Sequence, residues 1–147
     1  MIKTLIPCYD ALLHTKVQKC SYNLDRSKIS YLLHENMYHH NGIGLSANQI
    51  GINERVFVMI SDLDTQETIT CFNPKILKYS KDMVVMEEGC LSYPDKFVEV
   101  ERSETVVVKY EDENKVDHKI KLEGFAARVF LHEFDHMQGI NFTQRER

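Results

Sequence analysis

Two histidines and a glutamate near the carboxyl end of the chain form its clearest chemical pattern. His132 and His136 are four residues apart, and Glu133 directly follows the first of them. On an α-helix, residues four apart lie on one face about 6 Å from each other, so their imidazoles can bind one metal ion. A glutamate beside such a pair can take the proton of a water molecule at the metal. The pattern predicts a hydrolytic metal site, although two helix histidines can also lie side by side without any ligand role.

A catalytic site of this kind needs a third protein ligand and a position that is open for water. Metalloproteases with a similar motif take that ligand from further along the chain, and here this solution fails. The third histidine of a metzincin would fall at Phe142, which cannot bind a metal, and Glu146 is the only later carboxylate. We expect Glu146 to lie in a frayed tail. The third ligand must therefore come from earlier in the sequence.

Cys90 is the best upstream candidate for the third ligand. It stands within Glu88-Gly89-Cys90-Leu91-Ser92, where the glycine allows an exposed bend at the end of a strand. A cysteine thiolate is a strong ligand for zinc or iron(II). The competing interpretation is a small buried core residue, which free cysteines often are. We keep that interpretation for Cys8, Cys20 and Cys71.

A glycine-containing segment, Gly42-Ile43-Gly44, lies far upstream of these residues. Glycines allow a backbone to approach a substrate closely, and Gln49 supplies a neutral amide donor shortly afterwards. The segment lacks the Gly-Lys-Ser/Thr of a phosphate-binding loop. Taken alone, it is best interpreted as a plain turn.

Two helices and a set of strands must position these groups. Apolar residues at helical spacing predict a helix over 27–40, ended by Asn41-Gly42, and a second helix over 125–138, closed by Gly139. The second helix carries both histidines. Pro74 is expected to end one of the strands. The predicted strands are 55–60, 68–73, 76–79, 83–87, 97–100, 105–110 and 116–122.

This order of elements predicts an α+β fold, with antiparallel β-sheets packed around a C-terminal metal-binding helix and one N-terminal helix. No repeat, low-complexity tract or linker interrupts the sequence, so residues 1–147 are expected to form a single catalytic domain. The 18 Lys and Arg against 22 Asp and Glu give a net charge of -4. That balance argues against a general nucleic-acid binder.

The sequence gives no sign of a membrane or secretory protein. No apolar run approaches the roughly 20 residues that span a bilayer, and the first residues lack a convincing signal peptide. We therefore expect a cytoplasmic protein. Its four cysteines are expected to be reduced in that compartment.

The same residues resemble the signatures of the peptide deformylase family. The sequence Gly42-Ile43-Gly44-Leu45-Ser46-Ala47-Asn48-Gln49 is similar to the family's Gly-x-Gly-x-Ala-Ala-x-Gln, with Ser46 where alanine is usual. The family's Glu-Gly-Cys-Leu-Ser and His-Glu-x-Asp-His occur complete at 88–92 and 132–136. Val100-Glu101-Arg102 is similar to the family's Val-x-Arg. All of these occur in the family's order.

The resemblance implies a metal-dependent hydrolase that removes the formyl group from N-formyl-methionine of nascent polypeptides and releases formate. Cys90, His132 and His136 would hold one divalent metal ion, natively iron(II) (Fe²⁺). Zinc, nickel and cobalt are alternatives, since thiolate and imidazole suit all four.

It also implies roles for the neighbouring residues. Glu133 would move the protons, while the Gln49 amide and the Leu91 backbone N–H would stabilise charge on the formyl oxygen. At position 46, a small side chain is the only expected requirement, and Ser46 meets it. The residues expected to contact an N-formyl-methionyl peptide are Gly42, Ile43, Gly44, Leu45, Glu88 and Gly89.

The expected partners follow from the same comparison. We expect a monomer that binds formyl-methionyl peptides, with no nucleic-acid or membrane partner. Bacterial members continue through a long C-terminal helix that anchors them to the ribosome, whereas this sequence ends at Arg147, as in phage-like short forms. Ribosome docking is therefore expected to be weak or absent.

Three other functions compete with deformylation. A metallopeptidase could use the same ligands on an internal peptide bond. A catalytically silent metal- or peptide-binding protein would not need Gln49 and Glu133 together. A Cys/His thiol hydrolase would be inhibited by alkylation and would be insensitive to chelation.

Overall fold

The computed structural model describes all residues from 1 to 147. Its two α-helices are α1 (Arg26–His39) and α2 (Gly124–Met137). The Asp25 side chain accepts a hydrogen bond from the Lys28 backbone N–H and so caps the start of α1. Asn41, with φ of 59°, turns the chain just after α1, as the sequence predicts. Gly139, with φ of 74°, does the same after α2.

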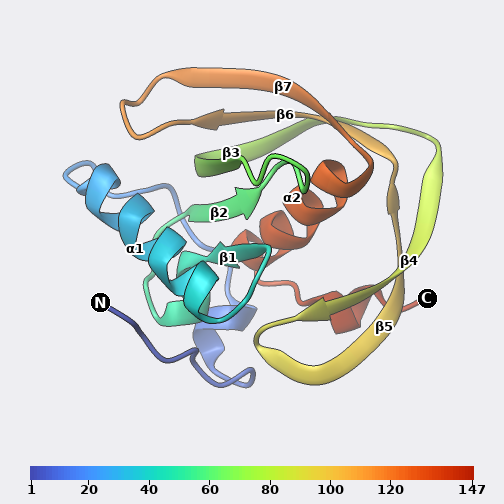
Figure 1. Ribbon diagram of the computed structural model, residues 1–147, viewed down its shortest axis with the longest axis horizontal. Coiled ribbons are helices and arrows are strands. Elements are labelled where there is room, and N and C mark those ends of the chain that lie inside the picture. The colour runs from blue at the N-terminus through green and yellow to red at the C-terminus, as the bar shows by residue number, and fades with distance from the viewer.

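The strands form two antiparallel sheets (Figure 1). A five-stranded sheet has the order β1-β2-β3-β6-β7, and a two-stranded sheet consists of β4 and β5. Their bounds are β1 Gly44–Ser46, β2 Val56–Ile60, β3 Thr68–Tyr79, β4 Met83–Cys90, β5 Tyr93–Ser103, β6 Thr105–Glu111 and β7 Asp117–Glu123. Three short 3₁₀ helices complete the fold: η1 Ala11–His14, η2 Ala47–Ile50 and η3 Phe142–Arg145. The predicted α+β architecture is confirmed.

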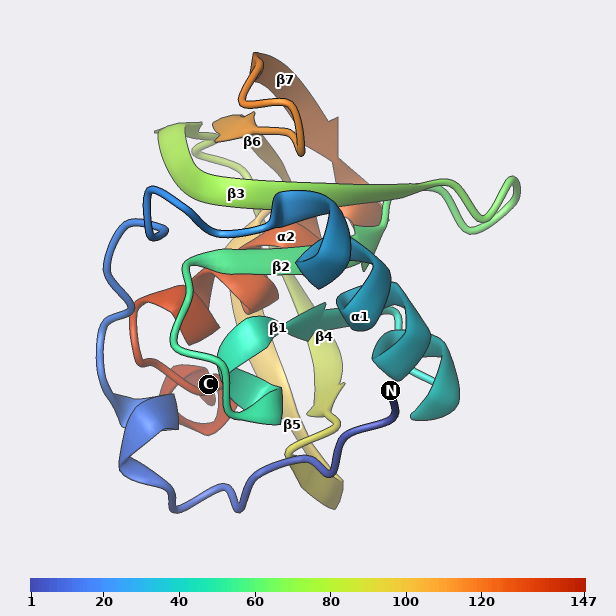
Figure 2. The same cartoon turned by 90° about the vertical axis from the view of Figure 1, so that its left-hand side faces the viewer.

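The two helices enclose β2 from opposite sides (Figure 2). Successive strand residues point to opposite faces. Phe57 and Met59 accordingly join the core beneath α2, whereas Val56 and Val58 join the core beneath α1. All five residues of β2 are buried. The helix that carries the two histidines therefore packs against a fully buried strand.

Two of the expected strands are one strand in the structure. The prediction that Pro74 ends a strand is wrong, because β3 continues from Thr68 to Tyr79. The pairing of β3 with β6 shifts register between Phe72 and Lys75. A proline, which cannot donate a ladder hydrogen bond, is tolerated at such an irregularity.

The C-terminal residues are not frayed, which corrects the expectation for this segment. Phe142 is only 1 % exposed and packs with Val98 and Val100 of β5. The Arg147 backbone N–H donates to the Glu99 carbonyl. The C-terminal residues therefore pack against β5 and form a hydrogen bond with it.

Replacing Phe142 with alanine is expected to lower the free energy of unfolding by about 3–5 kcal/mol, the usual loss for a fully buried phenylalanine. Urea unfolding of the purified variant measures this change. Tyr22→Ala is the matched control, because the Tyr22 side chain is 91 % exposed. A loss below about 1 kcal/mol for Phe142→Ala, the scale of an ordinary point substitution, would contradict the described packing.

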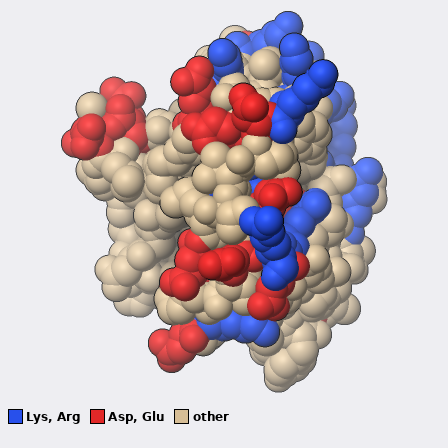
Figure 3. All heavy atoms as spheres, turned by 90° about the vertical axis from the view of Figure 1, so that its right-hand side faces the viewer, with Lys and Arg blue, Asp and Glu red and all other residues tan.

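Charged side chains of both signs are interleaved on the face that β4 and β5 form (Figure 3). Arg147 and Glu101 approach each other there at 4.0 Å. None of the helices is long and apolar enough to cross a membrane.

Candidate metal centre and active site

Helix α2 presents three chemically active side chains on neighbouring positions. His132 and His136 lie one turn apart, with ring centroids separated by 5.2 Å and planes nearly perpendicular. Glu133 is 4 % exposed and His136 is 2 % exposed. The helix is amphipathic, so this buried side faces β1, β2 and the β4–β5 hairpin rather than solvent.

Cys90 reaches this helix as the last residue of β4. Its Sγ lies 3.4 Å from His136 Nε2, and the ligand atoms of Cys90, His132 and His136 all lie within 4.8 Å of one another. The pairing of β4 with β5 shifts register between Gly89 and Cys90. A Cβ on Gly89 would lie 2.6 Å from the Phe97 ring, so the glycine lets the two strands approach at this bend.

Two observations indicate that these residues can hold a metal ion. One thiol and two imidazoles form a donor set that suits a transition metal. In addition, Glu133 Oε1, beside this group, is buried without a hydrogen-bond partner. Buried polar atoms of this kind are costly unless something binds to them. The arrangement supports a single metal ion and does not identify it.

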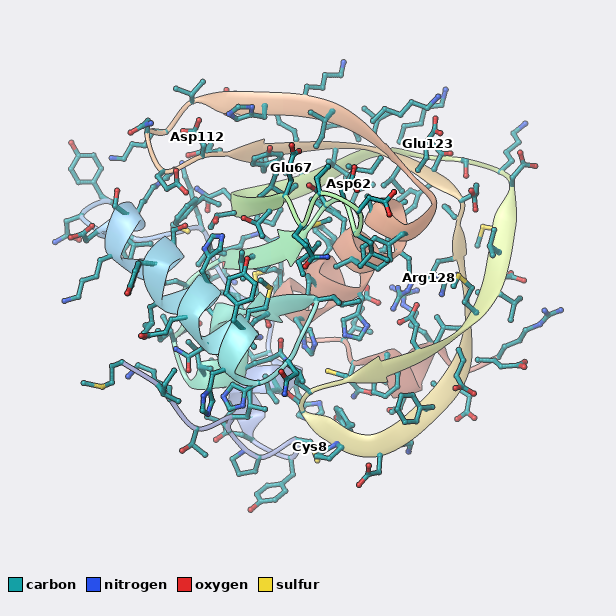
Figure 4. All side chains as sticks on the ribbon, in the orientation of Figure 1. Cys8, Asp62, Glu67, Asp112, Glu123 and Arg128 are labelled. Atoms are coloured by element: carbon teal, nitrogen blue, oxygen red, sulfur yellow. The ribbon has the colours of Figure 1, made fainter.

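The outer nitrogen of His132 is held by Glu88. His132 Nδ1 donates to Glu88 Oε1 at 3.0 Å, which leaves His132 Nε2 free to face the cluster. Carboxylates in this position fix the orientation of metal-binding histidines. Arg102 donates to both oxygens of Glu88, at 2.6 and 2.9 Å, and Arg128 donates to Glu88 Oε2 at 2.6 Å. Figure 4 shows Arg128 extending from α2 toward β4.

Arg102 also connects this group to the far side of α2. Its Nη1 donates to Asp135 Oδ2 at 2.9 Å, and Arg145 of η3 donates to both Asp135 oxygens, at 3.1 and 3.0 Å. The Arg102, Glu88 and Asp135 side chains are each at least 93 % buried. Each of these three buried charges therefore has a partner of opposite sign.

Burial and hydrogen bonding shift four pKa values in the cluster. Burial raises the pKa of Glu133 to about 7 and lowers the pKa of His136 well below its ordinary value. Burial would also lower the pKa of His132, but hydrogen bonds with Cys90 and Glu88 outweigh it and raise the pKa to about 10. Burial would raise the pKa of Glu88, yet hydrogen bonds from His132 and Arg102 lower it to about 2. Glu88 thus stays a carboxylate, whereas Glu133 can exchange a proton near neutral pH.

Gln49 lies in η2 with its amide directed at the cluster. Its Oε1 accepts a hydrogen bond from the Ser46 backbone N–H at 3.0 Å. Its Nε2 consequently faces the other way, donating to Ser92 Oγ at 2.9 Å and lying 3.6 Å from Cys90 Sγ. A fixed N–H donor beside the Cys/His/His group can stabilise negative charge that develops there.

A cavity of about 520 Å³ opens directly onto these groups. Gly44 lies so close to α2 that a Cβ would stand 2.6 Å from Glu133 Oε2, and a Cβ on Gly42 would stand 2.7 Å from Leu91 Cδ1. Leu45 alone among the expected contact residues does not line the cavity; it is fully buried beneath α1. The predicted residues that do line it are Gly42, Ile43, Gly44, Gln49, Glu88, Gly89, Cys90, Leu91, His132 and Glu133.

Several side chains around the site did not stand out in the sequence. Arg128 is four residues before His132 on the same helix, and this spacing could have indicated a contact. Phe142 packs against the His132 ring, with centroids 5.9 Å apart. The Asn48 amide donates to the His136 carbonyl at 2.9 Å. Asn48 and His136 are 88 residues apart in sequence, and Phe142 lies beyond the end of α2, so no helical spacing predicts either contact.

Comparison with known proteins finds one family. The family model described as polypeptide deformylase matches residues 2–147. The peptide deformylase of Thermotoga maritima is 47 % identical over 111 residues, which cover 76 % of this chain and 66 % of that relative, just under two thirds of its length. The peptide deformylase of Pseudothermotoga lettingae is 38 % identical over 144 residues, which cover 97 % of this chain and 81 % of that relative.

Solved structures share the whole fold. The crystal structure of the Thermotoga maritima peptide deformylase is 36 % identical and has a TM-score of 0.93, over 100 % of this chain and 99 % of that one. A Met-Ala-Ser-bound class I type b peptide deformylase from Acinetobacter baumannii is 32 % identical, with a TM-score of 0.89 over 99 % and 98 % of the two chains.

Proposed function

Because the chain belongs to the polypeptide deformylase family, we propose that it removes the formyl group from N-formyl-methionyl peptides and releases formate. The observation that carries this proposal is the grouping of Cys90, His132 and His136 within 4.8 Å, beside Glu133 and the Gln49 amide. The Met-Ala-Ser ligand of the Acinetobacter baumannii relative is a peptide with a free N-terminal methionine, the kind of product that this reaction yields.

We propose Cys90 Sγ and one ring nitrogen each of His132 and His136 as the three protein ligands of one divalent ion. Iron(II) is the proposed native metal, and the same ligands also accept zinc, nickel or cobalt. When bound, such an ion lowers the pKa of a water molecule and polarises a carbonyl group. Glu88 orients the His132 ring through its hydrogen bond to Nδ1. The hydrogen bond from Asn48 to the His136 carbonyl holds the backbone of the second histidine.

Glu133 is the proposed proton carrier. It accepts a proton from the water molecule that attacks the formyl carbon, and it delivers a proton to the amine nitrogen as the carbon–nitrogen bond breaks. The raised pKa of Glu133, about 7, lets one carboxyl group perform both transfers near neutral pH. The products are formate and a peptide with a free N-terminal amine.

The formyl oxygen gains negative charge when water adds to the formyl carbon. The Gln49 side-chain amide and the Leu91 backbone N–H are the proposed donors to this oxygen. Gln49 suits the role because Ser46 fixes its Oε1 and so directs its Nε2 toward Cys90.

The peptide is proposed to lie between two strand edges. β1 is the terminal strand of its sheet and β4 pairs only with β5, so both strands have a free edge. An extended peptide can add to such edges through backbone hydrogen bonds. Ile43, Phe125 and Val129 line the same cavity and offer apolar surface for the methionine side chain.

We further propose that the protein acts as a monomer in the cytoplasm. The proposed ligands Cys90, His132 and His136 already meet within a single chain, beside Glu133 and Gln49. Relatives from Oryza sativa and Solanum lycopersicum are named as chloroplastic, so the compartment is tested separately from the chemistry.

Replacing Gln49 with leucine is expected to lower kcat by roughly 10²–10³-fold, the usual effect of removing one donor to a developing oxyanion. Steady-state kinetics on formyl-Met-Ala-Ser measure this change. Gln18→Leu, which removes an exposed amide outside the cavity, is the matched control. Unchanged kcat in Gln49→Leu would remove this side chain from the mechanism.

Product analysis separates deformylation from peptide cleavage. Mass spectrometry of formyl-Met-Ala-Ser after incubation is expected to show intact Met-Ala-Ser and formate. Fragments cut at an internal peptide bond would instead identify a metallopeptidase. An unchanged peptide in the presence of bound metal would identify a silent binding protein.

A further inference from the structure

Ser46 and Asn48 connect the Gln49 turn to the helix that carries the histidines. Ser46 Oγ donates to Asn48 Oδ1 at 2.6 Å and also lies 3.0 Å from Gln49 Oε1. Asn48 Nδ2 donates to the His136 carbonyl at 2.9 Å. Ser46 and Asn48 are both fully buried. A continuous path of hydrogen bonds therefore runs from the proposed oxyanion donor to a proposed metal ligand.

The direction of each amide follows from its partners. The His136 carbonyl can only accept, so it must face the Asn48 NH₂ group, and the Asn48 oxygen then faces Ser46. Ser46 supplies the hydroxyl hydrogen that this oxygen needs, and its backbone N–H holds the Gln49 oxygen. Without the hydroxyl, the buried Asn48 oxygen has no donor, and an unpaired buried acceptor is costly. The Asn48 amide is then free to rotate away from His136.

We propose that Ser46 and Asn48 are positioning residues that couple the Gln49 amide to the metal-binding helix through His136. The inference deepens the proposed function, on which its kinetic consequence rests. It also changes the role expected of Ser46, which the sequence alone suggested needs only to be small. The family usually has alanine at this position, so loss of the hydroxyl is compatible with the fold.

The test compares Ser46→Ala, Asn48→Ala and the double variant. Each protein is loaded with zinc, and the rate at which a chelator removes the metal is measured. Loss of one hydrogen bond of about 1.4 kcal/mol corresponds to about a tenfold change. We therefore expect metal loss about tenfold faster in each single variant, with no further increase in the double variant, because Ser46 acts on His136 through Asn48. kcat is expected to fall severalfold in Ser46→Ala while KM stays nearly constant.

Two buried polar residues distant from the cavity are matched controls. Ser30 pairs with Thr70, and Asn36 donates to the Leu32 and Met1 carbonyls. Ser30→Ala and Asn36→Ala are expected to lower stability without changing the rate of metal loss.

Two results would overturn the proposal. One is a rate of metal loss in Ser46→Ala equal to that of the wild-type protein. The other is a double variant whose effect is the product of the two single effects, which would show that the residues act independently. If Asn48→Ala fails to fold, the rate of metal loss in Ser46→Ala alone tests the proposal. Metal loss requires no turnover, so a protein that releases no formate would refute the proposed function and leave this test intact.

Discussion

Replacing Glu133 with glutamine is expected to abolish turnover while the metal and the fold remain. The amide has nearly the shape of the carboxyl group, so the packing of Glu133 against Gly44 is preserved. It cannot accept and deliver a proton. Because Glu133 is the proposed carrier in both transfers, the loss of kcat should exceed the roughly 10²–10⁴-fold of a typical general base.

Turnover and metal content must be measured on the same preparation of Glu133→Gln. Formate release gives kcat, and elemental analysis gives the metal bound per chain. Glu67→Gln is the matched control, because Glu67 is exposed and its carboxylate has no partner in the structure. Near-normal turnover in Glu133→Gln would assign the proton transfers to another group.

Replacing Cys90 with alanine is expected to remove the metal and, with it, all activity. The proposed site has three protein ligands, and Cys90 supplies the only thiolate among them. Two imidazoles alone bind a divalent ion much more weakly. Loading with zinc, followed by gel filtration and elemental analysis, measures the metal that remains.

Cys8→Ala provides the comparison for Cys90→Ala. The expectation that Cys8 is a buried core residue is wrong, because Cys8 is partly exposed like Cys90. It does not belong to the Cys/His/His group (Figure 4). It should retain a full equivalent of metal and normal turnover. A full equivalent of metal in Cys90→Ala would show that the ligand assignment is wrong.

The local parts of this site were predictable from sequence. The period of apolar residues indicates α2, and the spacing of His132 and His136 places both on one face of it. The left-handed residues Asn41 and Gly139 end the two helices where their types predict. Each of these features depends only on residues within a few positions of one another.

The parts that escaped prediction depend on contacts between distant segments. Pro74 lies within a strand because β6 tolerates a register shift there. Phe142 is buried because β5 covers it. Arg102 connects Glu88 to Asp135 across 14 and 33 residues of sequence, respectively. No short-range pattern encodes such pairs, since only the folded chain brings them together.

The four cysteines show how the same residue type divides between structure and chemistry. Cys71 is fully buried in the core, where burial raises its pKa well above the ordinary value. Cys90 lies half-buried at the end of β4, within reach of His136. The neighbouring Gly89 indicated from sequence that Cys90 lies at an exposed bend rather than in the core. The structure adds the contact between Cys90 and His136.

Formate release by the metal-loaded protein tests the central claim most directly. The protein is purified without oxygen, stripped with a chelator, and assayed on formyl-Met-Ala-Ser as iron(II), zinc, nickel or cobalt is added back. We predict one formate per peptide consumed, no activity in the stripped protein, and activity that rises with added metal to a plateau at one equivalent per chain. Full activity in the stripped protein, or a fully loaded protein that releases no formate, would contradict the account.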